Sequence, residues 1–178
     1  MSPMSFNFIH QWIKREDGIA ASEFALVFPV MFIMMLGMID LGNGLLTNKK
    51  VITAAQMAAD LVTRELIASD ADITDAMTAA QLAIQPLDTT SFGIDIAAIR
   101  FLGDNADATV IWRDTQNMPP NGNIEALAEG LGVENEGLIA VTVQYNYEPT
   151  FSNTFLNPIS MQEVAFMRGR RNSFVDRE

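Results

Sequence analysis

The side chain with the most unusual position for chemistry is the carboxylate of Glu23. It lies five residues after Gly18, near the start of an apolar run that continues to Ile39. A charged group inside a membrane-length helix costs free energy, so such a residue generally marks a functional site. The simpler alternative is an interfacial glutamate whose carboxylate reaches up to the lipid headgroups.

Few other side chains are suited to catalysis or metal binding. The chain has no cysteine, which excludes disulfides, thiolate nucleophiles and cysteine-ligated zinc. Its single histidine, His10, precedes the apolar run and leaves histidine-based catalysis and metal binding with almost no basis. The net charge of −11 argues against nucleic acid as a partner. We therefore predict a protein that is not an enzyme and has neither a cofactor nor a metal.

The apolar run has the length of a membrane-spanning helix. It comprises 21 residues from Ile19 to Ile39 and contains no charge except Glu23. As a helix it would be roughly 31 Å long, close to the hydrocarbon thickness of a bilayer. Pro29 lacks an N–H group, so we expect a local kink there.

Two other interpretations of this run are a cleaved secretory signal peptide and a plain uncleaved signal anchor. The run is long for a signal peptide, contains a glutamate and is followed by no clear small-residue cleavage site. Charge does not predict the orientation of the helix, because Lys14 and Arg15 flank one side while Lys49 and Lys50 flank the other.

The residues around Gly18 and Glu23 resemble a known processing signal. A short polar leader, a glycine and an apolar helix with glutamate at the fifth position are similar to the type IV prepilin signature. The residues that follow point to a more specific group, because they resemble the TadE-like family of minor pseudopilins of the tight-adherence (Tad) pilus. The resemblance covers about residues 14–60, and it is carried by Ala21-Ser22-Glu23-Phe24-Ala25-Leu26-Val27-Phe28-Pro29 and by Asp40-Leu41-Gly42.

This resemblance implies that a prepilin peptidase cuts between Gly18 and Ile19 and removes a leader of residues 1–18. The new amino group of Ile19 would then lie one helical turn from Glu23. Both charged groups are destabilised by desolvation and stabilised by pairing. If the pair forms between subunits, it would draw the next helix into axial register.

Helix–helix packing is predicted close to this site. Ala21 and Ala25 are spaced i, i+4 and form a small-residue face that allows a second helix to approach closely. The alternative is that alanine is simply common in membrane helices. With Phe24 and Pro29 they make up the predicted packing residues.

We divide the mature chain into a membrane helix, 19–46, and an exported domain, 47–178. The helix is expected to continue along a buried stripe, with a bend or a partly unwound stretch at the preceding glycines, Gly37, Gly42 and Gly44. A second helix is predicted over 74–84 and stopped by Pro86. The acids around its start suggest either a calcium loop or helix capping, and capping is favoured because the glycine and final glutamate of a calcium loop are missing. The stripe consists of Val51, Ala55, Ala58, Val62 and Leu66, and the acids are Asp70, Asp72 and Asp75.

From Gly93 the apolar residues alternate, which is typical of strands. Strands are predicted over 94–99, 109–114, 138–147 and 161–168, with a hairpin loop at 103–105 and a short helix over 124–131. In the third strand one face is apolar from Ile139 to Tyr147, while Thr142, Gln144 and Asn146 would face water. The predicted fold class is therefore α+β: a long N-terminal helix followed by a small antiparallel sheet packed on its stripe. This arrangement resembles the type IV pilin architecture.

Two surface features have alternative interpretations. Trp112, Tyr145 and Tyr147 could form a sugar-binding surface, but core packing is favoured. A basic patch near the C-terminus is interpreted as solvated, and it consists of Arg168, Arg170 and Arg171.

The resemblance implies a minor pilin that takes part in assembly of a Tad/Flp-type pilus used for surface adherence and biofilm formation. Its partners would be the inner membrane, the prepilin peptidase, the major Flp pilin, other pseudopilins and the Tad inner-membrane platform. It would lie in the bacterial inner membrane with a cytoplasmic N-terminus and a periplasmic C-terminal domain, or in the extracellular pilus. The alternative is a membrane-tethered extracytoplasmic binding module that does not polymerise.

Overall fold

The computed structural model describes residues 17–151 and 157–178. The predicted leader up to residue 16, with His10, Lys14 and Arg15, lies outside the described residues. The elements, in chain order, are α2 (Asp17–Val62), β1 (Ile67–Ala68), α3 (Asp70–Ile84), β2 (Gly93–Leu102), β3 (Asp107–Gln116), α4 (Ile124–Ala128), β4 (Gly137–Tyr147), β5 (Ile159–Met167) and β6 (Asp176–Arg177). The predicted α+β fold, a long N-terminal helix followed by a small antiparallel sheet, is confirmed.

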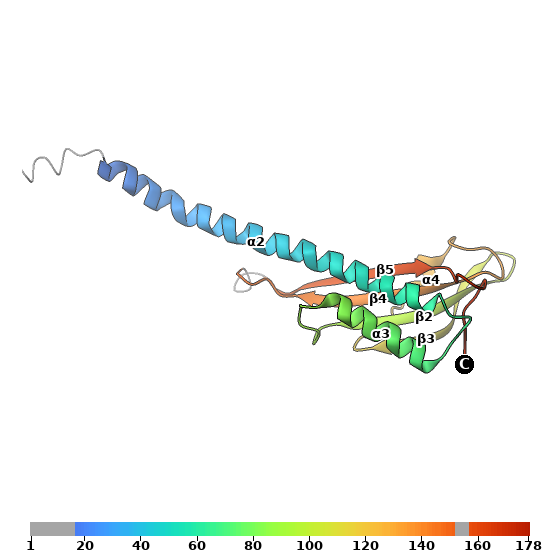
Figure 1. The fold of residues 1–178 in the computed structure, drawn as a ribbon. Helices are drawn as coiled ribbons and strands as arrows, with labels where there is room; N and C mark the ends of the chain where they lie inside the picture. The colour runs from blue at the N-terminus through green and yellow to red at the C-terminus, as the bar shows by residue number, and fades with distance from the viewer. Residues whose placement is uncertain (1–16, 152–156) are drawn as a thin grey trace, which may run out of the picture.

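Helix α2 is a single rod of 46 residues, about 69 Å long. Its N-terminal half projects alone, while its C-terminal half lies on the sheet (Figure 1). The partly unwound stretch predicted at Gly37, Gly42 and Gly44 is not present, because the helix is continuous through all three and through Pro29. Gly44 instead provides space: a Cβ atom there would lie 3.3 Å from the Tyr147 ring.

The end of α2 also differs from the prediction. The helix stops at Val62, so Leu66 does not extend the buried stripe and is 47% exposed. Backbone hydrogen bonds of the Arg64 and Glu65 amides to Leu61 and Val62 tighten the chain into a turn that leads to β1. Strand β1 then pairs in parallel with β6, which fastens the C-terminal tail beside α3.

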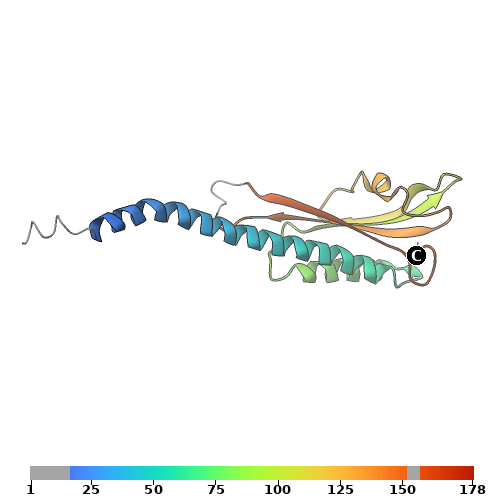
Figure 2. The same cartoon turned by 90° about the horizontal axis from the view of Figure 1, so that it is seen from above.

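The main sheet has the strand order β3-β2-β4-β5, and each neighbouring pair is antiparallel. The predicted hairpin between β2 and β3 is confirmed, with Gly103 at a positive φ of 74° in its turn. Helices α2 and α3 cover one face of the sheet and α4 lies on the other (Figure 2). The domain therefore has three layers.

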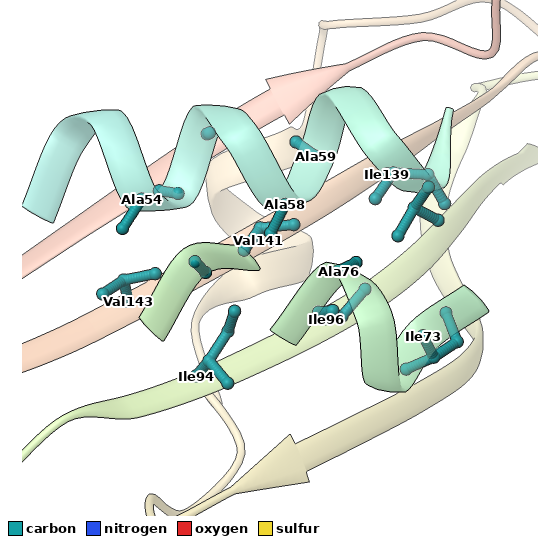
Figure 3. Packing of buried hydrophobic residues seen from close by; sticks show 14 of the residues in the cluster. Ala54, Ala58, Ala59, Ile73, Ala76, Ile94, Ile96, Ile139, Val141 and Val143 are labelled. Carbon is teal, nitrogen blue, oxygen red and sulfur yellow. The ribbon is translucent and has the colours of Figure 1, made fainter. Parts of the chain in front are cut away.

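The core lies between the two long helices and the sheet. Small residues of α2, Ala54, Ala58 and Ala59 among them, let it approach α3 and the sheet closely, and branched residues of β2 and β4 fill the space beneath (Figure 3). The predicted packing of the stripe on the sheet is confirmed for Val51, Ala55, Ala58 and Val62, all of them 0–1% exposed.

The prediction that Thr142, Gln144 and Asn146 all face water is wrong for the first of them. Thr142 is fully buried, because Asn121 from the β3–β4 connection covers it and donates an Nδ2 hydrogen bond of 3.1 Å to its hydroxyl. Helix α4, which is shorter than the predicted 124–131, contributes Ile124 and Ala128 to a second apolar cluster on this face. Only Gln144 and Asn146, near the end of the strand, keep contact with solvent.

Helix α3 begins at Asp70, four residues before the predicted start. Ser69 is its N-cap: its hydroxyl accepts from the Asp72 amide, and the Asp72 carboxylate accepts from the Ser69 amide at 2.9 Å. Capping as the role of these acids is confirmed for Asp70 and Asp72, which lie in the first turn.

The predicted aromatic packing is confirmed as well. Tyr145 and Tyr147 are each only 6% exposed, and the Trp112 indole N–H donates a hydrogen bond of 2.9 Å to the Val175 carbonyl. The basic patch is more than solvated charge, since Arg168 pairs with Glu136 at 3.1 Å and Arg170 pairs with Asp60. Both arginine side chains nevertheless stay more than half exposed.

Candidate functional site

The N-terminal half of α2 is an unpartnered apolar surface. Every residue from 19 to 39 is exposed except the half-buried Leu36. Large side chains such as Leu26, at 79% exposure, and Ile33, at 68%, are left uncovered by the described part of the chain. Among the described residues, α2 is the one helix long and apolar enough to cross a membrane. A helix that is apolar on all sides needs lipid or other helices around it.

The predicted processing site lies at the start of this surface. Because α2 begins at Asp17, the backbone of Gly18 is in its first turn. The Ser22 hydroxyl donates a hydrogen bond of 2.8 Å to the Ile19 carbonyl, inside the same turn. Glu23 follows one turn after Ile19 and is exposed.

The predicted site residues divide between two sides of α2. At about 100° per residue, Ile19 and Glu23 are separated by roughly 40° and share a face. Ala21 is roughly 200° away from Glu23 around the axis, so the small-residue face of Ala21 and Ala25 points nearly the opposite way. Pairing at Glu23 and packing at the alanines would therefore engage different neighbours.

An aromatic row that sequence reasoning missed lies beside the alanine face. The ring centroids of Phe24 and Phe28 are 5.4 Å apart, and those of Phe28 and Phe32 are 5.7 Å apart. The signal in the sequence is the i, i+4, i+8 spacing, which places the three rings on one side of a helix. Of the predicted packing residues, Phe24 belongs to this row, and Ala25 and Pro29 lie next to it.

The second notable feature is the junction where the projecting half of α2 meets the sheet. Asp40 is only 5% exposed, and its carboxylate accepts hydrogen bonds from the Thr150 amide at 3.0 Å and the Phe151 amide at 3.1 Å. The Tyr147 hydroxyl donates a hydrogen bond of 2.9 Å to the Asp40 carbonyl. Burial, and after it the charge of Asp40, raises the pKa of Tyr147, which therefore stays a neutral donor.

These bonds fasten the end of β4 to α2. The sequence signal was the acidic residue that directly follows the apolar run, in Asp40-Leu41-Gly42. Beside it lies a groove of about 360 Å³ between α2 and the neighbouring ends of β4 and β5, lined by Gly37, Asp40, Leu41, Gly44, Leu45, Asn48, Tyr147, Pro149, Ile159 and Met161.

Comparison with known protein families finds a match within α2. Residues 18–60 match the model of the TadE-like protein family. We call residues 18–60 the TadE-like segment. No curated protein and no solved structure matches the chain.

The TadE-like segment corresponds to α2 alone, which spans Asp17–Val62. It includes the projecting half, the Asp40 junction and nearly all of the stripe that packs on the sheet. The match covers about a quarter of the chain and implies involvement in the Tad pilus system. The sheet and the helices α3 and α4 lie outside it.

Proposed function

We propose that this chain is a minor pilin that takes part in assembly of a Tad/Flp-type pilus used for surface adherence and biofilm formation. The observation that carries the proposal is the coincidence of the TadE-like segment with α2, whose exposed apolar half has Glu23 near its start. In this proposal residues 19–46 anchor the chain in the inner membrane. The N-terminus is cytoplasmic and the domain 47–178 is periplasmic.

Processing and pairing form the core of the proposed mechanism. A prepilin peptidase cuts between Gly18 and Ile19, and the new amino group starts the mature helix. Paired with Glu23 of a neighbouring subunit, this amine loses much of the penalty of being charged in lipid. A helix out of register leaves both charges unpaired, so the pair selects one axial position. The alanine face and the phenylalanine row remain available for a second neighbour.

The proposed role is structural and involves neither catalysis nor a cofactor. The partners are the prepilin peptidase, the major Flp pilin, other pseudopilins and the Tad inner-membrane platform. Residues Phe24, Ala21, Ala25 and Pro29 are the proposed contacts between helices.

Replacing Glu23 by alanine tests the pairing. The variant Glu23→Ala should still insert, because the helix becomes more apolar, while its recovery in sheared pili or in cross-linked pilin complexes should fall at least tenfold. Ser22→Ala is the matched control, since Ser22 is an exposed neighbour whose hydroxyl bonds only within its own helical turn. Normal incorporation of Glu23→Ala, with membrane extraction unchanged, would show that the pairing is wrong.

A membrane-tethered binding module is the second candidate. A cavity of about 530 Å³ favours it, because this cavity opens between α2, the α3–β2 loop and the end of β4 and contains Lys50, Asp88, Tyr145 and Glu148. Such a module would keep residues 1–18 and would be absent from pili. Replacing Gly18 by leucine separates the two candidates further, because it should block maturation of a pilin and leave a tethered module unaffected.

A further inference from the structure

The exported domain has an apolar end that faces the projecting half of α2. Phe151 and Ile159 are 47% and 48% exposed there, beside the groove described above. On α2 the neighbouring Leu41 and Leu45 are 68% and 62% exposed. Of the described residues that line the groove, Asp40 alone is acidic or basic, and its carboxylate accepts hydrogen bonds from two backbone amides.

The height of this end along α2 follows from its contacts. Ile19–Ile39 is roughly 31 Å of helix, which matches the hydrocarbon core of a bilayer, so Asp40 marks the point where α2 leaves it. Because Asp40 accepts from the Thr150 and Phe151 amides, these residues lie at the same height. The ends of β4 and β5 reach back along α2 to its middle, as Figure 1 shows. The end of the exported domain nearest Asp40 thus lies at the edge of the hydrocarbon core.

We propose that this end of the exported domain docks into the bilayer that α2 spans, and that the groove takes the acyl chains of phospholipids in the adjoining leaflet. The proposal rests on α2 crossing the membrane, and it depends on neither processing at Gly18 nor incorporation into a pilus. Apolar surface at this height meets the boundary between acyl chains and headgroups rather than bulk water, and burying it there is favourable.

Continuity with the membrane helix favours lipid as the occupant. The groove runs into the lipid-facing surface of α2 through Gly37 and Leu41, so acyl chains reach it without crossing a polar barrier. A peptide strand or loop would need polar partners. Among the described residues, the polar side chains that line the groove are Asp40, Asn48 and Tyr147, and the Tyr147 hydroxyl is bonded to the Asp40 carbonyl. Docking would also fix the tilt of the domain, because contacts at both Asp40 and Ile159 prevent it from swinging about α2.

The absence of cysteine permits a direct test with the full chain. Single-cysteine variants carrying a nitroxide spin label are reconstituted in phosphatidylcholine vesicles. The accessibility of each label to oxygen, which partitions into lipid, is compared with its accessibility to a water-soluble nickel chelate. Ile159→Cys and Phe151→Cys report on the docking end, and Ile33→Cys reports on insertion of α2.

Ile111→Cys is the matched control, because Ile111 is 47% exposed and as apolar as Ile159. Its neighbour Val110 pairs with Ile99 on β2, and Ile99 pairs with Leu138 on β4. Leu138 and Tyr147 are about 30 Å apart along β4, so Ile111 lies far from the docking end. The proposal predicts that labels at 159 and 151 behave like the label at 33, with at least fivefold more oxygen than nickel accessibility relative to the label at 111.

Several results would overturn the proposal. Nickel accessibility at 159 and 151 equal to that at 111 would place this end in water. Labels at 159 that are shielded from both reagents, with spin–spin broadening that grows with the protein-to-lipid ratio, would show a second copy in the groove. A water-exposed label at 33 would remove the membrane-spanning premise, and with it this inference. If the labels at 159 and 151 are lipid-like and the chain extracted from a cell that assembles the pilus keeps residues 1–18, the docking is upheld while the proposed pilin is contradicted.

Discussion

The two halves of α2 have the same backbone and opposite surroundings. From Ile19 to Ile39 most side chains are large and apolar, and all but the half-buried Leu36 are exposed. From Val51 to Val62 small and branched apolar residues form one buried stripe, while Thr53 and Gln56 face outward. The first pattern needs an apolar environment from outside the chain, and the second is satisfied by the chain's own sheet. One helix therefore joins a surface for partners to the framework of a folded domain.

Alanine shows the contrast most clearly. Ala54, Ala55, Ala58 and Ala59 are 0–1% exposed and bring α2 close to α3 and the sheet. Ala21 and Ala25 are exposed. Alanine thus packs inside the domain in one half of α2 and lies on an exposed surface in the other half. The following substitutions test this contrast, from the largest expected effect to the smallest.

Truncating one buried and one exposed isoleucine should separate the halves most strongly. Ile96 is fully buried in β2, so Ile96→Ala should lower the free energy of unfolding of the domain by about 2–5 kcal/mol. Ile33→Ala, in the projecting half, should change it by less than about 0.5 kcal/mol. Denaturant titration of the full chain in detergent micelles, followed by Trp112 fluorescence in a Trp12→Phe background, measures both. Equal losses for the two variants would contradict the division.

Enlarging an alanine in each half makes the comparison sharper. Ala58→Leu should lower the same free energy by about 1–3 kcal/mol, because the space between α2, α3 and β4 is already filled. Ala25→Leu should leave domain stability unchanged and reduce cross-linking to pilin partners. The same titration and a cross-linking yield test the pair. Unaltered cross-linking by Ala25→Leu would remove the alanine face from the assembly surface.

The junction between the halves depends on Asp40. In Asp40→Ala the amides of Thr150 and Phe151 lose their carboxylate acceptor, at a cost of about 1–3 kcal/mol. Hydrogen exchange at these amides should accelerate about tenfold or more, while exchange in the buried part of β4 changes little. Asp75→Ala, at an exposed acid on α3, is the control. Unchanged exchange at both amides would show that Asp40 does not hold the end of β4.

The smallest expected effect is at the cap of α3. Ser69→Ala should lower the free energy of unfolding by about 1 kcal/mol at neutral pH, whereas the exposed Thr78→Ala should not. Hydrogen bonds from the side chain and then the backbone of Ser69 hold the pKa of Asp72 below its usual value. The ionised carboxylate thus stabilises the folded state above its ordinary pKa and loses this effect as the pH falls through the lowered value. Titrations at several acidic pH values should show the difference between Ser69→Ala and the wild type shrinking over that range.

Local sequence patterns predicted most of the fold. The stripe on α2 and the alternation in β2, β3 and β4 follow directly from helical and strand periodicity. The prediction was wrong where a residue distant in the sequence determines burial. The alternation within β4 predicted that Thr142 faces solvent, yet Asn121, 21 residues earlier, covers it. The early start of α3 was missed for a local reason, because the reciprocal bonds of Ser69 and Asp72 were not recognised as its cap.

The candidate site was predictable in part. Glu23 and Gly18 are prominent because a charge and a glycine border an apolar run, whereas the role of Asp40 depends on amides 110 and 111 residues away in the chain. No local pattern reveals such a contact. Helical periodicity places Glu23 and Ala21 on nearly opposite sides of α2, although the two residues are close together in the sequence.

The most direct test of the account is the intact mass of the chain extracted from membranes of a cell that assembles the pilus. We expect an N-terminus at Ile19, so that the projecting half of α2 starts with the amine that pairs with Glu23. We also expect that Gly18→Leu keeps the longer mass. Retention of residues 1–18 by the wild-type chain would contradict the account.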